Sequence, residues 1–510
     1  MRKLTKLLFL SLCASSLSLS GCYFNFINIS TDDISPTTLK YTYNDFVNRN
    51  IAPIDGTPVS GSPKLLVVPV WFTDSISYIS LLNKERVRSD IQKAYFGSND
   101  DTGWRSVHTY YQELSQNKLN LTGVVTDWYE CGYTSKSFYS SQSKTEQLVV
   151  DAVNWYKESH SMTDFDSDQN GYLDGVMLIY GSPDYGTLQN DNASNMWAYC
   201  FWLQKNNANK ANPQPNAFFW ASYDFMYGEN KSSISPYHAG DTDYCNLDTH
   251  TYIHEMGHMF GLEDYYDYSK QCIPAGGFSM QDYNIGSHDP YSVMALGWAK
   301  PFVPTGDCTI ELHNFQDSHE LIALGVNRID SPFDEYLLLE LYTPTGLNKF
   351  DTDHQYNGRY PKGPSFSGIR LWHVDARLLE CELNSDGTAR ALNFTSSIKS
   401  NYYYTQAMKN TYYKEGGTTN GYISPLGQEY ADYNLLQLIR KSKAKNYKCN
   451  EVISSYDLFS QGDSFEISKY KDQFVNGSKT NAKYDFPWSF TIKSLNSGSA
   501  KIKIEKEGLF

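Results

Sequence analysis

The chain has 510 residues, of which 40% are hydrophobic and 15% aromatic, which is enough apolar material for two or three globular domains. Its 41 tyrosines and 26 phenylalanines exclude long disordered regions. The formal net charge is −14, and loss of residues 1–21, which hold three basic residues and no acid, would make it −17. A surface of this charge repels nucleic acid and anionic lipid, so no nucleic-acid partner is expected.

The N-terminus, MRKLTKLLFLSLCASSLSLSGC, has a basic start, a short apolar run and small residues before a cysteine, which predicts a signal peptide at residues 1–21. Its ending, LSGC, resembles the lipobox of bacterial lipoproteins, in which the cysteine becomes the acylated first residue. The alternative is an ordinary cleaved signal. We expect an extracytoplasmic membrane lipoprotein or cell-surface protein, attached through a lipid on Cys22. A transmembrane helix is less favoured because no later stretch reaches about 18 apolar residues.

The cysteines after Cys22 are seven in number, and none of their spacings is a CxxC metal site. They are Cys131, Cys200, Cys245, Cys272, Cys308, Cys381 and Cys449. In an oxidising compartment this odd number allows at most three disulfides and leaves one thiol over.

The first half of the chain alternates strand-like and helix-like segments after a polar stretch at 22–63, which we interpret as a tether or short pro-segment. The expected elements are a buried strand at 64–74, helices at 84–96 and 105–116, a strand at 118–130, a helix at 143–159 and a strand at 175–181. This order predicts an α/β (α+β) domain over residues 64–300.

An acidic loop, DFDSDQNGYLDG at 164–175, has the ligand spacing of a calcium loop. Oxygen ligands would come from the side chains of Asp166, Asp168, Asn170 and Asp174 and from the carbonyl of Tyr172. The twelfth position holds Met177 instead of the glutamate that closes an EF-hand. We expect structural Ca²⁺ here; the alternative is a solvated acidic turn.

The segment HEMGHMFGLED, residues 254–264, carries the pattern of a zinc site. His254 and His258 are one helical turn apart on the same face, so both can bind one Zn²⁺ ion. Glu255 beside them is expected to take a proton from a zinc-bound water, whose pKa the metal lowers to roughly 7. HExxH alone is a common pattern, so the residues around it must also fit before it predicts a zinc site.

The third ligand is predicted to be Asp264. Gly261 can end the helix with a positive φ and turn the chain back toward the metal. Asp264 then follows at the spacing of the metzincin pattern, with Asp in place of the final His. Glu263 is the weaker alternative, one residue short, and a thermolysin-like later glutamate is disfavoured because none occurs before Glu311.

A methionine-containing turn is expected beneath the metal at GGFSMQDY, residues 276–283. Met280 is the candidate methionine, and Tyr283 could offer its phenol to a developing oxyanion as a catalytic residue. Each also has a structural interpretation, as a core methionine and a packed aromatic.

After about residue 300 the chain becomes rich in strand-like segments, which predicts a β-rich C-terminal region at 301–510, a sandwich being one form it could take. Strands are expected at 308–315, 319–329, 335–342, 368–378 and 490–508. His373 in the fourth of these is interpreted as a core histidine.

HEMGHMFGLEDYYD (254–267) and GGFSMQDYNIGSHDPYSVMALGW (276–298) together resemble the immune inhibitor A-like metallopeptidases of bacteria. So do residues 106–129, EYLLLE (335–340) and GIRLWHVD (368–375), and the likeness spans roughly 64–375. The resemblance implies a zincin-like fold with His254, His258 and Asp264 on zinc and Glu255 as general base and acid. The chain departs from the long secreted members in having a lipobox and no large pro-region.

These patterns predict a lipid-anchored zinc endopeptidase that hydrolyses peptide bonds in proteins or peptides. The rival function is a surface adhesin or glycoprotein-binding protein that keeps a protease fold. Glu255 and the full ligand set favour the enzyme, since a binding module has no need of that base.

Overall fold

The computed structural model describes most of the chain between residues 34 and 508. The described residues are 34–43, 45, 56–203, 205, 207–228, 247–267, 272–282, 286–353, 362–383, 389–395, 403–405 and 432–508. The predicted signal peptide, Cys22 and Tyr283 lie outside these ranges. Within them, no helix combines the length and apolar character needed to cross a membrane.

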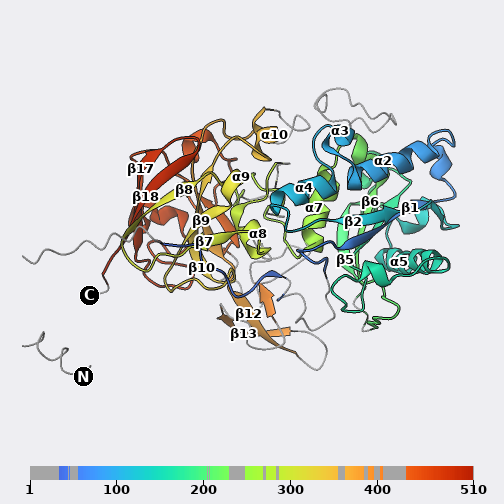
Figure 1. Ribbon diagram of the computed structural model, residues 1–510, viewed down its shortest axis with the longest axis horizontal. Coiled ribbons are helices and arrows are strands. Elements are labelled where there is room, and N and C mark those ends of the chain that lie inside the picture. The colour runs from blue at the N-terminus through green and yellow to red at the C-terminus, as the bar shows by residue number, and fades with distance from the viewer. Residues whose placement is uncertain are drawn as a thin grey trace, which may run out of the picture.

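The first sheet occupies the blue-to-green lobe of Figure 1, with strand order β2-β1-β4-β6-β5 and β3 pairing with β1. Its strands are β1 (Lys64–Trp71), β2 (Thr122–Val125), β3 (Tyr129–Glu130), β4 (Val176–Tyr180), β5 (Tyr199–Trp202) and β6 (Ala217–Ser222). Neighbouring strands are parallel except β5, which pairs antiparallel with β6 at the edge. Most residues of β1 and all of β4 and β6 are buried, as expected of a sheet covered on both faces.

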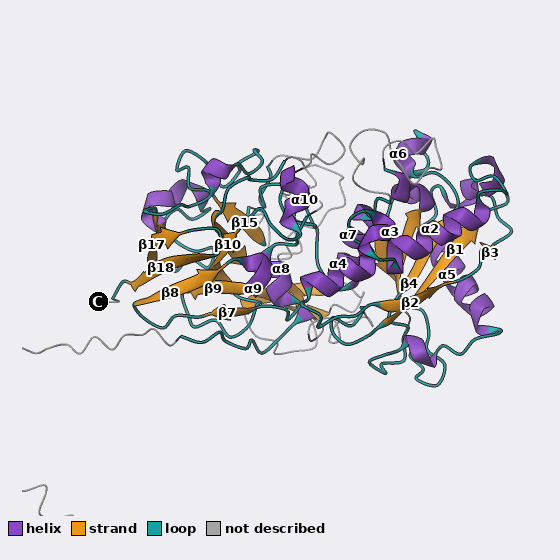
Figure 2. Cartoon of the chain, turned by 45° about the horizontal axis from the view of Figure 1, so that its top comes forward, coloured by secondary structure: helices purple, strands orange, loops and turns teal. Residues whose placement is uncertain are grey.

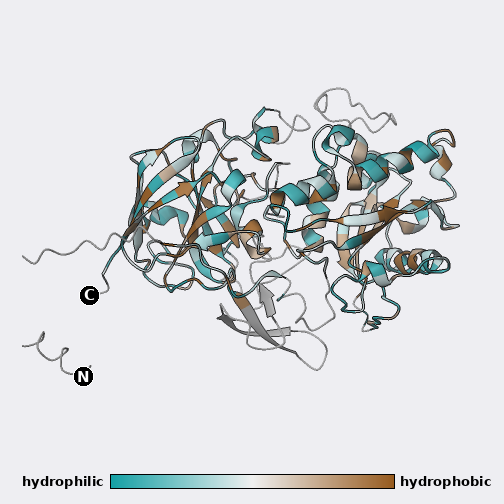
Figure 3. Cartoon of the chain, viewed as in Figure 1, coloured by the Kyte–Doolittle hydropathy of each residue, from teal (hydrophilic) through white to brown (hydrophobic). Residues whose placement is uncertain are grey.

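Helices cover both faces of this sheet. On one face, β1 residues such as Leu65 and Val67 share a core with α2 (Lys84–Phe96), α4 (Val107–Leu114) and α7 (His250–Met259). On the other face, Leu66 and Val68 share a core with α5 (Gln142–Lys157). Figure 3 shows the hydrophobic residues concentrated along the strands and along one side of α5. The mixed α/β character expected for this half of the chain is therefore present.

Strands dominate the C-terminal half, as the sequence predicted. One sheet has the order β15-β11-β10-β9-β7 and another the order β16-β17-β18-β8, and the two share one buried core. The first contains β7 (Lys300–Phe302), β9 (Glu320–Gly325), β10 (Glu335–Tyr342), β11 (Gly368–Asp375) and β15 (Leu436–Ile439). The second contains β8 (Cys308–His313), β16 (Ser464–Glu466), β17 (Trp488–Leu495) and β18 (Ser499–Lys506). Two sheets packed through a shared core form a sandwich-like arrangement.

Smaller elements complete the described chain. A three-stranded sheet joins β12 (Leu378–Leu383), β13 (Ala389–Thr395) and β14 (Tyr403–Thr405). Short helices are α3 (Asn99–Thr102), α6 (Tyr185–Leu188), α8 (Pro290–Ala295), α9 (Phe315–Ser318) and α10 (Asn348–Asp353). Short 3-10 helices lie at Ser75–Ser77, Ser135–Phe138, Thr163–Phe165, Ser194–Met196, Tyr223–Tyr227, Ser455–Asp457 and Ile467–Gln473.

One hydrophobic core continues from the first lobe into the second. It includes Ile253 of α7, Leu338 of β10, Trp372 of β11 and Leu436 of β15. Figures 1 and 2 both place α4, α7 and α8 between the first sheet and the C-terminal strands. The core therefore draws residues from both sides of position 300, and the domain boundary expected there stays a prediction.

The described part of the polar stretch at 22–63 packs onto the molecule. Tyr43 is 1% exposed, and its ring meets Phe333 edge-on at 5.5 Å. The backbone N–H of Thr57 donates to the carbonyl of Met259 at 2.9 Å, and the indole N–H of Trp298 donates to the carbonyl of Val59 at 2.8 Å. Residues 34–43 and 56–63 therefore do not behave as a free tether, because they cap α7 and fill the core.

Candidate metal centre

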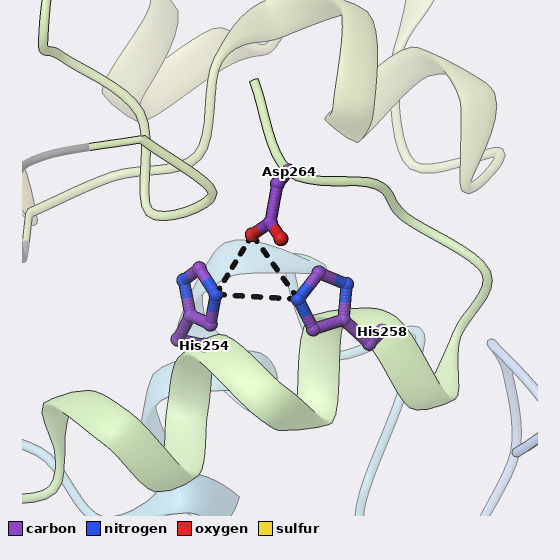
Figure 4. A group of neighbouring side chains, drawn as sticks. All are labelled: His254, His258 and Asp264. Atoms are coloured by element: carbon purple, nitrogen blue, oxygen red, sulfur yellow. Dashed lines mark hydrogen bonds and ion pairs between the residues drawn. The ribbon is translucent and has the colours of Figure 1, made fainter. Parts of the chain in front are cut away.

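Helix α7 carries both predicted histidine ligands on one side. His254 and His258 are separated by one turn, and their Nε2 atoms lie 3.2 Å apart. Figure 4 shows the two imidazoles rising from the same side of the helix, with the Asp264 carboxylate meeting them from the chain that follows. The i, i+4 spacing thus produces the convergence expected from the sequence.

The end of α7 is built on Gly261, whose φ of +98° lies in the left-handed region. The Gly261 N–H donates to the His258 carbonyl at 2.9 Å, and the Leu262 N–H donates to the Gly257 carbonyl at 3.0 Å. This pair of bonds is a Schellman motif, which ends a helix and reverses the chain. The predicted role of Gly261 is therefore confirmed in geometric terms.

Asp264 arrives where the turn delivers it. Its Oδ1 atom lies 3.1 Å from Nε2 of His254 and 3.3 Å from Nε2 of His258. The next residue fixes this position, because the Tyr265 N–H donates to the Gln281 carbonyl at 2.7 Å and its hydroxyl bonds to Ser292 at 2.7 Å. In the described part of the chain, His254, His258 and Asp264 form the one cluster with metal-ligand spacing. Glu263 is not a member.

Backbone carbonyls set the orientation of both imidazoles. Nδ1 of His254 lies 2.7 Å from the carbonyl oxygen of Met280, and Nδ1 of His258 lies 2.8 Å from that of Leu262. A carbonyl can only accept, so each Nδ1 carries a proton and each Nε2 is the ring atom left to face a metal. Met280 therefore contributes to the site through its backbone, while its side chain is fully buried.

The donor set fits a zinc ion. Three ligand atoms on a tetrahedral zinc, each about 2.0–2.1 Å from the metal, lie about 3.3 Å from one another. The three separations here are 3.1, 3.2 and 3.3 Å. Two imidazoles and one carboxylate also leave a fourth position for water or substrate, as catalytic zinc sites do.

Glu255 lies on α7 with a buried carboxylate. Its side-chain atom Oε2 is enclosed and has no hydrogen-bond partner among the described residues. Burial raises the pKa of Glu255, and the neighbouring histidines His258 and His254 oppose that shift. The Cys200 thiol of edge strand β5 donates to the backbone carbonyl of Glu255 at 3.0 Å. An unpaired buried oxygen beside a metal cluster is suited to accept a proton from a bound reactant.

The metal-free cluster holds opposite charges together. Burial by itself lowers the pKa of His258. The negative charges of Asp264 and Glu255 outweigh this effect and raise the pKa to about 10. Burial likewise raises the pKa of Asp264, yet His258 and His254 bring it well below the ordinary value. A proton on His258 therefore lies where a divalent cation would bind, and metal binding would release it.

Sequence reasoning missed three supports of the site. Gln281 packs against α7 so closely that a Cβ on Gly257 would lie 2.5 Å from its Oε1 atom. Ser279 donates to Asp289 at 2.7 Å, which joins the methionine turn to the start of α8. Cys200, whose thiol donates to the backbone carbonyl of Glu255, is the third support. The pattern Asp289-Pro290-x-Ser292, a helix N-cap signal, could have identified the second support.

The other predicted positions have different outcomes. Tyr283 lies outside the described residues, so its catalytic role stays a prediction. His373 lies buried on β11, with Nε2 2.9 Å from Oε1 of Glu335, which confirms it as a core histidine.

The predicted calcium loop lies within the described residues. Several of its carboxylate oxygens accept hydrogen bonds from backbone N–H groups. Asp166 accepts from the N–H groups of Asn170 and Gly171 at 2.9 and 3.0 Å. Asp174 accepts from Lys64 and Ser167, and burial raises its pKa to about 6. Among the described residues, the loop carboxylates do not form a cluster of the kind that the zinc candidates form. Calcium binding, with Asp168 and the Tyr172 carbonyl as further ligands, stays a prediction.

Comparison of the whole chain with protein-family models gives no match, and comparison with curated proteins gives none either. The family resemblance seen in the motifs therefore remains a prediction, and the function must be argued from the site itself.

Proposed function

We propose that this chain is a zinc-dependent endopeptidase that hydrolyses peptide bonds in proteins or peptides. The observation that carries the proposal is the convergence of His254, His258 and Asp264 within 3.1–3.3 Å, next to the buried Glu255 carboxylate. A binding protein has no use for a desolvated base at that position.

His254 and His258 would hold zinc through Nε2, and Asp264 would hold it through Oδ1. When bound, zinc supplies Lewis acidity toward the scissile carbonyl and lowers the pKa of water. The protein's own contribution is orientation, because both imidazoles are locked by carbonyl acceptors and Asp264 is anchored through Tyr265. Such supports typically change metal affinity or activity by about 10–100-fold when lost.

Glu255 would act as general base and then as general acid. Its unpaired Oε2 atom can accept the proton of the attacking water and later deliver it to the leaving amine. In the metal-free protein, burial raises the pKa of this carboxyl, which favours its protonated form.

The surrounding fold supports a zincin-like assignment in outline. A mostly parallel sheet ends in the antiparallel edge strand β5, which touches the site helix α7 through Cys200. In general, an edge strand beside a catalytic helix is an element with which an extended peptide can pair. We further propose that the enzyme works outside the cytoplasm, anchored through Cys22.

The first prediction separates catalysis from metal binding. In the purified full-length protein, Glu255→Gln should keep about one zinc per chain and lose at least about 100-fold in the rate of cleavage of an unfolded protein substrate. Asp264→Ala should lose most of the zinc, because two histidines alone bind it weakly. Elemental analysis and cleavage-site profiling by mass spectrometry measure the two effects.

Glu263→Gln is the matched control, since it changes the adjacent carboxylate and should leave zinc and activity unchanged. Full activity in Glu255→Gln would overturn the mechanism. Unchanged zinc in Asp264→Ala together with zinc loss in Glu263→Gln would move the third ligand to Glu263. Zinc binding without any cleavage by the wild type would favour the adhesin instead.

A further inference from the structure

Two chain segments far apart in sequence lie side by side. Residues 272–276 lead from the Asp264 loop to the methionine turn, and residues 449–453 belong to the C-terminal region. The Ile273 N–H donates to the Cys449 carbonyl at 2.9 Å, and the Ile453 N–H donates to the Gly276 carbonyl at 2.8 Å. The two bonds join the segments at both ends, although neither segment forms a strand.

This pairing brings two cysteines together. The bond joins the peptide that follows Cys272 to the carbonyl of Cys449, so covalent geometry keeps their Cα atoms within about 8 Å of each other, a range that includes the separations a disulfide spans. Both cysteines are in the thiol form in the structure. The thiol of Cys272 lies 3.6 Å from Oδ2 of Asp267, and Cys449 is partly exposed.

The other described cysteines have no such arrangement. Cys131 follows β3, Cys200 lies on β5 and Cys308 begins β8, so they occupy separate elements. The Cys200 thiol also donates to the Glu255 carbonyl of α7. Cys272 and Cys449 are therefore the pair that the backbone aligns.

We propose that Cys272 and Cys449 form a disulfide that fastens residues 272–276 to the C-terminal β region. With a low-molecular-weight disulfide such as oxidised glutathione, the more accessible Cys449 thiolate attacks one sulfur and releases one glutathione thiol. The Cys272 thiolate then attacks the Cys449 sulfur and releases the second. Two protein thiols are oxidised and one glutathione disulfide is reduced, so atoms and electrons balance.

The Cys272–Cys449 disulfide would restrain the segment that leads to Met280, whose carbonyl accepts from His254. It would therefore restrain a support of the metal centre without touching a ligand. Its existence does not depend on protease activity, because both segments are placed by backbone bonds of the fold.

The test is peptide mapping of the purified full-length chain after incubation with oxidised glutathione and blocking of remaining thiols. We expect a cross-linked peptide pair that contains Cys272 and Cys449, about 2 Da lighter than the sum of the two thiol peptides. In Cys449→Ser the pair should vanish and Cys272 should become alkylated. Reduction should lower the thermal midpoint of the wild type by several degrees and leave that of Cys449→Ser unchanged.

Two results would overturn the proposal. One is alkylation of both Cys272 and Cys449 in protein whose other cysteines have been oxidised. The other is a cross-link of Cys272 to a different cysteine, such as Cys245 or Cys381. Cys308→Ser serves as the control and should keep the cross-link, because that cysteine lies on β8. Zinc content and cleavage are not needed for the readout, so failure here leaves the proposed function standing.

Discussion

Gly257 shows how a single residue determines whether the site can assemble. It sits inside α7, where alanine would ordinarily be favoured by up to about 1 kcal/mol. A Cβ there would instead lie 2.5 Å from Oε1 of Gln281, whose side chain is fully buried. The backbone carbonyl of Gln281 also accepts from the N–H of Tyr265, next to Asp264.

We expect Gly257→Ala to lower the free energy of unfolding by about 1–3 kcal/mol, the usual cost of overpacking. It should also weaken zinc binding, since a displaced Gln281 would release the Asp264 turn. Urea unfolding of the metal-free protein and zinc competition titration measure these effects.

The matched background is Gln281→Ala. There the same Gly257→Ala substitution should be neutral or stabilising, because the clash is gone. If the single variant Gly257→Ala has the same free energy of unfolding as the wild type, the Gln281 side chain moves aside without a loss of stability, and the prediction is wrong.

At the scale of elements, the short helix α9 gives a pH prediction. It ends at His319, which has a φ of +55°, is 5% exposed and stacks on Phe315 with ring centroids 5.1 Å apart. Burial lowers the pKa of His319 to about 4. The folded protein thus favours neutral His319, and the unfolded chain takes up a proton below its ordinary pKa of about 6.5.

The contribution of His319 to stability is therefore full above about pH 6.5 and is lost as the pH falls through about 4. We expect His319→Asn, which tolerates the left-handed backbone, to remove on the order of 2–3 kcal/mol of acid sensitivity between these values. Urea unfolding at pH 7 and pH 4 measures it. Identical acid sensitivity in the variant and the wild type would contradict the assignment.

Elements with a strong local pattern could be predicted from the sequence. Residues 84–96 form α2 and 335–342 form β10 at the expected bounds, because helical spacing and a long apolar run are unambiguous there. The expected strand at 118–130 splits into β2 and β3. Short elements such as α8 and β7 were not predicted, since so few residues carry no usable periodicity.

At the scale of the whole molecule, the N-terminal stretch belongs to the fold. The hydroxyl of Tyr43 lies 3.1 Å from that of Tyr291, just after the Asp289 network that supports the methionine turn. The polar composition of residues 22–63 did not indicate this packing, because one tyrosine among polar neighbours barely changes the mean hydropathy of the segment.

Tyr43→Ala should therefore lower the free energy of unfolding by about 3–5 kcal/mol, as for other buried aromatic residues. Urea unfolding of the full-length protein is the measurement. Lys40→Ala is the control, because Lys40 forms an exposed ion pair with Asp330 and its loss should not be resolvable. A tether or removable pro-segment would instead show no change for Tyr43→Ala.

The sequence by itself determined the parts of the site that depend on spacing within one short segment. His254, Glu255 and His258 lie on one helical turn, and Gly261 and Asp264 follow from the way a helix ends, so local rules were sufficient. Only the tertiary structure decided what surrounds them. Gln281 and Cys200 reach the site from other elements, and contacts between distant segments, such as that between residues 273 and 449, leave no periodic pattern in the chain.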